Sequence, residues 1–255
     1  MFEFSYDVVG LLLIVAFIAG FVDSIAGGGG LITLPALMLA GASPLEALST
    51  NKVQGAFGAA SAAFTYTRSG LVDFRTQFGA AGLAFGASFI GAMLISSIPT
   101  EPLRLFLPVL LVGIALFFAF KKRLDDTDRH RRISPKMFLF TLVPLVGFYD
   151  GLIGPGAGAF YMIGFVTLAG YGVLKSTAHT KLLNFASNIG GLLAFAAVGK
   201  PLWGIGIAMG FAQMAGAQVG SRLAMRIGAR VIKPLLVATS SLLAARLIWQ
   251  MLQAS

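Results

Sequence analysis

Apolar runs long enough to cross a lipid bilayer recur along this chain of 255 residues. A membrane-spanning helix needs about 20 mainly apolar residues, and several runs reach that length. Hydrophobic residues make up 57% of the sequence and charged residues 11%, about half the charged share of a soluble domain. The sequence therefore predicts an all-α, polytopic protein embedded in a membrane, with about 8–10 helical segments in the bilayer.

The distribution of charge favours membrane orientation over nucleic-acid binding. The net charge is +9, but the cations lie mostly in short loops between apolar runs, where they orient a membrane protein. Cysteine is absent, so disulfides, thiolate metal sites and cysteine nucleophiles are excluded. The first residues, MFEFSYD, are acidic, whereas a cleavable signal begins with basic residues. We expect no catalytic residues, no cofactor, no metal and no nucleic-acid partner.

Two halves of the chain repeat one another. The stretch GFVDSIAGGGG from residue 20 aligns with GFYDGLIGPGA from residue 147, which places Asp23 opposite Asp150. After a shift of two residues, Lys52 lies opposite Lys181 and Arg104 opposite Lys233. Such a match predicts an internal duplication. The first repeat is 1–120, a charged linker is 121–136, and the second repeat is 137–255.

Two of the apolar segments are too short to span a bilayer, and each follows a glycine break. Each short segment either forms one arm of a hairpin or continues the helix before it. The ten segments are 8–26, 31–41, 45–66, 76–98, 103–120, 137–153, 157–170, 175–198, 202–222 and 234–252.

The positive-inside rule decides between the two alternatives. Only hairpins place the linker 121–136, the loop with Arg68 and Arg75, and the basic cluster 222–233 on the cytoplasmic side together. Each repeat then holds an odd number of elements, so the halves enter the membrane in opposite directions. Inverted repeats with broken helices are typical of secondary transporters, and the chain is expected to be a multi-pass membrane protein of that kind.

The glycine breaks and the polar helix starts that follow them predict a site for a small oxyanion. A helix that restarts inside the membrane presents unpaired N–H groups and a partial positive charge to an anion. Polar residues in a membrane helix face protein or a cavity. The candidate substrate-binding residues are Gly28, Gly29, Gly30, Asn51, Lys52, Gly156, Thr180, Lys181, Asn184 and Asn188.

Several of these residues keep a structural alternative. The two lysines contact substrate, or snorkel, or pair with Asp23 and Asp150. The two aspartates brace the broken backbone or couple transport to protons, and His179 shuttles a proton or is simply packed. Asn184 and Asn188 bind substrate or join helices.

The aromatic residues Tyr66, Trp203 and Trp249 are predicted to lie in the membrane interface belt. Lys200 and Arg104 are the cations predicted to lie in loops on the outer side.

The quoted stretches, together with STNKVQGAFG from residue 49 and STAHTKLLNFASN from residue 176, resemble the sulfite exporter TauE/SafE family over nearly the whole chain. The resemblance implies a multi-pass protein of the bacterial inner membrane. It also implies secondary transport of sulfur-containing anions, such as sulfite, sulfoacetate or related organosulfonates, without an ATPase partner. The expected partners are a small anion and the lipid bilayer, and a homo-oligomer stays open. The alternative function is an anion channel, or transport of another small anion.

Overall fold

The structure is a computed structural model, and it describes residues 5–95, 116, 120, 125–198 and 200–254. The described part of the chain is helical, which confirms the all-α prediction. Among the described residues, α1 and α9 are the two helices that are long and apolar enough to cross a membrane by length and composition alone. The elements are α1 (Tyr6–Ala26), α2 (Gly29–Leu39), α3 (Pro44–Arg68), α4 (Phe74–Met93), α6 (Pro135–Phe140), α7 (Leu142–Leu152), α8 (Ala157–Gly164), η2 (Phe165–Ala169), α9 (Val173–Val198), α10 (Trp203–Ile227) and α11 (Ala229–Ala254).

Polar side chains gather inside the bundle and large apolar side chains cover much of its outside. Lys52 and Lys181 are 1% and 0% exposed, whereas Phe64 and Phe78 are 63% and 67% exposed. In water, exposing large apolar side chains and burying polar ones would both cost free energy. In a bilayer the exposed apolar side chains meet lipid, and the buried polar side chains mark the functional interior.

Each glycine break turns the chain back on itself and forms a hairpin. Gly27 and Gly28 adopt positive φ angles of 79° and 93°, a region that costs glycine little. Beyond them α2 runs back along α1, because Leu37 near the end of α2 belongs to the same apolar cluster as Leu12 near the start of α1. The first break therefore confirms the hairpin alternative.

The second break has the same form. Gly154 and Gly156 have φ angles of 90° and 88°. Tyr161 of α8 donates a hydrogen bond from its hydroxyl to the carbonyl oxygen of Val143, near the start of α7, over 3.2 Å. The helix α8 thus folds back along α7, as α2 folds back along α1.

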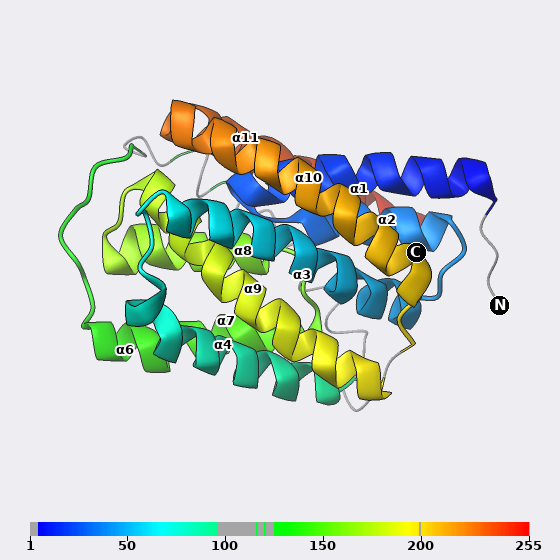
Figure 1. Ribbon diagram of the computed structural model, residues 1–255, viewed down its shortest axis with the longest axis horizontal. Coiled ribbons are helices and arrows are strands. Elements are labelled where there is room, and N and C mark those ends of the chain that lie inside the picture. Colours follow the sequence, from blue (N-terminus) through cyan, green and yellow to red (C-terminus); the bar gives the residue numbers. More distant parts are fainter. Residues whose placement is uncertain (1–4, 96–115, 117–119, 121–124, 199, 255) are drawn as a thin grey trace.

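The two halves pack reciprocally. Helix α1 of the first half packs on α10 of the second, and α7 of the second packs on α4 of the first. Helices α3 and α9 contact each other at the centre. In Figure 1, α3 runs from right to left and α9 from left to right, while α4 and α10 also run in opposite directions. This arrangement fits the predicted duplication, and the orientation in a membrane stays a prediction.

The charged linker lies at one end of the bundle and joins three segments there. The two carboxylate oxygens of Asp126 accept hydrogen bonds from the backbone N–H groups of Leu174 and Ala229, each over 2.9 Å. Arg129 donates its N–H to the carbonyl oxygen of Gly170. The linker, the start of α9 and the start of α11 are therefore at the same end, as the charge pattern predicts. Arg104 lies outside the described residues.

An ion pair at this end is expected to be present at neutral pH. The Asp128 carboxylate lies 2.5 Å from the Lys175 ammonium. Burial raises the pKa of Asp128, but the hydrogen bond from the Gly172 N–H and the contact with Lys175 outweigh it, and the pKa lies below its usual value. Asp128 is therefore ionised at neutral pH.

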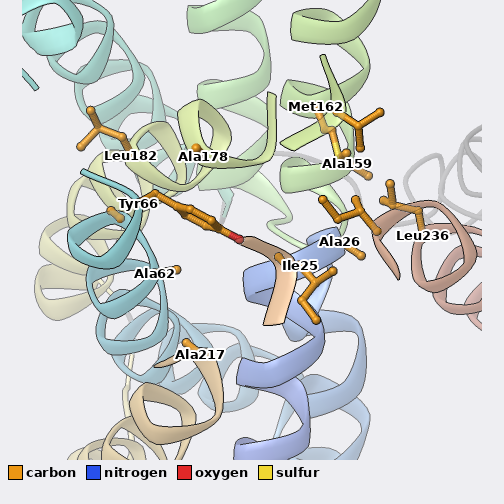
Figure 2. Packing of buried hydrophobic residues seen from close by; sticks show 14 of the residues in the cluster. Ile25, Ala26, Ala62, Tyr66, Ala159, Met162, Ala178, Leu182, Ala217 and Leu236 are labelled. Atoms are coloured by element: carbon orange, nitrogen blue, oxygen red, sulfur yellow. The ribbon is translucent and has the colours of Figure 1, made fainter. Parts of the chain in front are cut away.

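Tyr66 lies in the largest apolar cluster, so the prediction that it belongs to the interface belt is wrong. Its side chain is fully buried, and Figure 2 shows the ring between Ala178 and Ile25. Its hydroxyl donates to the carbonyl oxygen of Ser24 over 2.9 Å, so the polar end of the ring finds its partner inside the protein. Trp203 and Trp249 are exposed, as a belt position requires.

Candidate functional site

The two glycine breaks meet at a small cavity in the middle of the bundle. A Cβ atom added to Gly158 would lie 3.1 Å from the Cα atom of Gly27, so the two hairpin turns are in contact. The cavity has a volume of about 30 Å³, which is room for about two water molecules, so it must widen to admit a larger ligand. Seven of the predicted substrate-binding residues line it: Gly28, Gly29, Gly30, Asn51, Gly156, Asn184 and Asn188.

The first turn of α2 is already compensated by a carboxylate. One carboxylate oxygen of Asp23 accepts a hydrogen bond from the Gly29 N–H over 3.0 Å, and the other lies 3.1 Å from the Lys181 ammonium. A carboxylate at a helix N-terminus offsets the partial positive charge there. Asp23 therefore lies where it braces the broken backbone, which is one of the two roles expected for it.

Asn51 is held so that its amide nitrogen faces the same turn. Its Oδ1 atom accepts hydrogen bonds from the hydroxyl of Thr33 over 2.7 Å and from the amide of Gln54 over 3.3 Å. The opposite side of the carboxamide, Nδ2, lies against Gly30, where a Cβ atom would approach it to 2.9 Å. The two accepted bonds thus assign the amide orientation, and Asn51 offers a donor at the cavity wall.

The first turn of α8 has no comparable carboxylate cap among the described residues. Asp150, the counterpart of Asp23, pairs with the Lys52 ammonium over 2.8 Å and accepts a hydrogen bond from the Ser187 hydroxyl. Asn184 places its Nδ2 atom against Gly158, the second residue of α8. The α8 end of the cavity therefore keeps its partial positive charge, whereas the α2 end does not.

Each lysine pairs with the aspartate of the other half. Lys52 of α3 reaches Asp150 of α7, and Lys181 of α9 reaches Asp23 of α1. Neither lysine lines the cavity, although the Lys52 ammonium would lie 3.4 Å from a Cβ atom on Gly154 at its wall. The structure shows the ion-pair alternative for both lysines.

Two predicted residues lie away from the cavity. Thr180 is buried, and its hydroxyl has no hydrogen-bond partner among the described residues. His179 places Nδ1 3.0 Å from the carbonyl oxygen of Lys175 and packs edge-on against Tyr171 and Phe165. For His179 the geometry is the packed alternative, and its side chain does not line the central cavity.

Gln213 of α10 lines the cavity, and it was missed by the sequence analysis. It is 2% exposed, and its Oε1 atom, like Oδ1 of Asn184, is buried without a partner among the described residues. The repeat alignment could not reveal it, because its counterpart in the first half is Ala84. The available signal was the lone amide in the apolar stretch GFAQMAG.

A helical bundle with apolar outer faces and broken helices that meet at a buried polar cavity has the architecture of a membrane transporter. The chain belongs to the TauE/SafE family, because it matches the family described as "Sulfite exporter TauE/SafE" over residues 12–247.

Curated relatives cover nearly the whole chain. A "Probable membrane transporter protein ORF9" from Sinorhizobium sp is 52% identical, with 97% of this chain and 95% of the relative aligned. A "Probable membrane transporter protein YfcA" from Escherichia coli K12 is 44% identical, with 98% and 93% aligned. A "Probable membrane transporter protein YdhB" from Bacillus subtilis is 25% identical, with 91% and 97% aligned. No solved structure matches the chain. The protein is therefore a membrane transporter.

Proposed function

We propose that this transporter carries small sulfur-containing anions, such as sulfite, sulfoacetate or related organosulfonates, out of the bacterial cytoplasm. The observation that supports this most is the central cavity, where the first turns of α2 and α8 meet beside the amides of Asn51 and Asn184. Helix N-termini and amide N–H groups are suited to bind oxyanions. The family description supports the sulfur chemistry of the substrate.

The anion is expected to bind nearer to α8 than to α2. Asp23 already accepts from the first turn of α2, and its charge would repel a second anion there. At the α8 end, Gly156 and Gly158 leave the backbone open to close approach. The Lys52 ammonium lies next to Gly154 at this end. A small shift of the ammonium away from Asp150 would therefore bring a cation to the anion.

Alternating access is the mechanism that the reciprocal packing supports. Each buried ion pair joins one half of the chain to the other, so relative movement of the halves would rearrange both pairs at once. Inverted repeats around a central site are suited to this exchange. Export needs no further energy source in an inside-negative cell, because each anion charge gains about 2.3 kcal/mol per 100 mV. A channel with the same site would instead show ion conductance far above carrier rates.

The substitution Gly158→Ala is expected to reduce transport at least about tenfold, a loss of about 1.4 kcal/mol. The added methyl group would lie 2.9 Å from Nδ2 of Asn184 and 3.1 Å from the Cα atom of Gly27, so it would push this amide into the cavity and press the two turns apart. Gly158 does not have a positive φ angle, so the helix itself accepts alanine. The measurement is efflux of sulfite and of sulfoacetate from proteoliposomes, together with the thermal unfolding midpoint.

The matched control for this experiment is Gly86→Ala in α4, where nothing lies within 4 Å of the added methyl group. The control should transport like the unmodified protein. If Gly158→Ala also transports normally, the central cavity is not the anion site. If the unmodified protein moves neither anion but moves another, the substrate class is wrong while the site stands.

The inverted orientation predicts which end of the bundle faces the cytoplasm. The chain has no cysteine, so single cysteines can be labelled with a membrane-impermeant maleimide. Lys200→Cys, in the loop before α10, should react in intact spheroplasts. Thr127→Cys, in the linker, should react only after the membrane is permeabilised. Labelling of Thr127→Cys from outside would reverse the orientation and remove the argument for cytoplasmic export.

A further inference from the structure

A second cavity lies at the linker end of the bundle, apart from the central site. It has a volume of about 240 Å³ and is bordered by α4, α6, η2, α9 and the linker. His179 of α9 lines it, and Asn184 of the central cavity follows five residues later, about 7.5 Å along the helix. The proposed transport mechanism has so far given this cavity no role.

One wall of the cavity is a cluster of stacked aromatic rings. The rings of Tyr171 and Phe165 are nearly parallel, with centroids 5.7 Å apart and an interplanar angle of 9°. His179 packs against the Tyr171 ring at 4.8 Å and is held by its hydrogen bond to Lys175. Such a flat wall offers apolar contact to a small organic group.

The rim of the cavity carries a cation that is not neutralised by a neighbour. Arg131 lines the cavity, and its guanidinium lies 5.8 Å from the Tyr171 ring centroid and 3.4 Å from the Tyr171 hydroxyl. Among the described residues, Arg131 forms no ion pair, whereas nearby Lys175 is paired with Asp128. Arg131 is therefore available to an anion.

The opposite wall adds polar groups that suit the same ligand. Thr76 and Gln77 belong to the first turn of α4, where the carboxylate of Asp73 already accepts a hydrogen bond from the Arg75 N–H over 2.9 Å, so the side chains and not the helix end face the ligand. The Oε1 atom of Gln77 is buried and has no partner among the described residues, and exchanging the positions of the amide oxygen and nitrogen would present the NH₂ donor to a ligand there.

We propose that this cavity is a second anion subsite, which captures a small organic anion at the linker end before it reaches the central cavity. The acidic head group, a sulfonate or carboxylate, binds Arg131 and the side-chain amide of Gln77 in α4, and its short carbon chain lies on the aromatic wall. This inference rests on the proposed function, because it assigns the subsite to the transported anion. An anionic lipid head group carries the same charge, and the experiment separates the two ligands.

The test counts sulfoacetate ions bound to the purified full-length chain in a neutral detergent by equilibrium dialysis. The unmodified protein should bind a second ion in addition to the central one. Arg131→Gln should weaken binding of the ion in the linker-end cavity at least about tenfold and leave the ion in the central cavity bound. The matched control is Arg132→Gln, the exposed neighbour that does not line the cavity, and it should bind like the unmodified protein.

The outcomes separate this inference from the proposed function. If Gly158→Ala loses one bound ion and Arg131→Gln loses none, the linker-end subsite is overturned and the central site stands. If only Arg131→Gln loses an ion, the linker-end subsite stands and the central site fails. Absence of all binding to the unmodified protein would overturn both.

A sided transport measurement distinguishes a substrate subsite from a lipid site. In proteoliposomes, Arg131→Gln should raise the half-saturating sulfoacetate concentration several-fold for transport from the linker end and leave transport from the other end unchanged. An equal rise from both ends would overturn the entry role. If the ion in the linker-end cavity is displaced in nanodiscs of phosphatidylglycerol but stays bound in nanodiscs of phosphatidylcholine, the cavity is a lipid site.

Discussion

Replacing Lys52 with methionine is expected to destabilise the folded protein by about 3–5 kcal/mol and to abolish transport. The substitution leaves the Asp150 carboxylate without its cation, and Asp150 is only 4% exposed. A buried charge without a partner costs several kcal/mol. Because Asp150 also borders the central cavity, its negative charge would then repel the substrate anion. Stability is measured by unfolding in detergent and transport by efflux from proteoliposomes.

Two further variants show whether the lost stability comes from the unpaired charge. The double variant Lys52→Met, Asp150→Asn removes both charges and should recover a large part of the stability, while transport stays impaired. Lys181→Met should cost less than Lys52→Met, because the Asp23 side chain is 14% exposed and retains the Gly29 N–H. If Lys52→Met unfolds like the unmodified protein, the ion pair does not stabilise the fold.

The glycine breaks and three asparagines of the cavity could be predicted because local chemistry marks them. Four consecutive glycines, Gly27 to Gly30, inside an apolar run cannot continue a membrane helix. Asn51, Asn184 and Asn188 interrupt the long apolar helices that follow the two short arms. The hairpin shape followed from the positions of the cationic loops, because two cytoplasmic clusters require an even number of crossings between them.

The choice of partner for each lysine could not be read from the sequence. Lys52 pairs with Asp150, across the two halves, and not with Asp23 of its own half. The repeat alignment shows which residues are equivalent, but it does not show how one copy packs on the other. The same limit applies to the linker-end cavity, whose walls include α4, the linker and α9. These segments are far apart in the chain.

Tyr66 and Gln213 illustrate a different limit, which is that the same residue type suits opposite environments. A tyrosine near the end of a membrane helix fits the interface belt, but it is equally stable inside when its hydroxyl finds a carbonyl, as Tyr66 does at Ser24. Gln213 aligns with the apolar residue Ala84 in the first half. The duplicated pattern therefore gave no reason to select it.

Gly151→Ala is expected to cost about 3 kcal/mol or more of stability, at the upper end of the range for overpacking. A Cβ atom on this residue of α7 would overlap the backbone carbonyl group of Ser88 in α4. Because the obstructing atoms are backbone, no side chain can move aside, and the two helices must separate. Small residues at such crossings allow the close approach that holds membrane helices together. Thermal unfolding in detergent measures the loss.

The matched control is Gly82→Ala in α4, where nothing lies within 4 Å of the added methyl group, and it should unfold like the unmodified protein. Gly216→Ala tests the reciprocal crossing, because its Cβ atom would overlap the backbone carbonyl of Phe17 where α10 packs on α1. Similar losses at both crossings would show that the two halves depend on the same close contact. Normal stability of Gly151→Ala would mean that α4 and α7 lie farther apart than the structure shows. In that case Asp150, the neighbour of Gly151, would not be held where Lys52 reaches it.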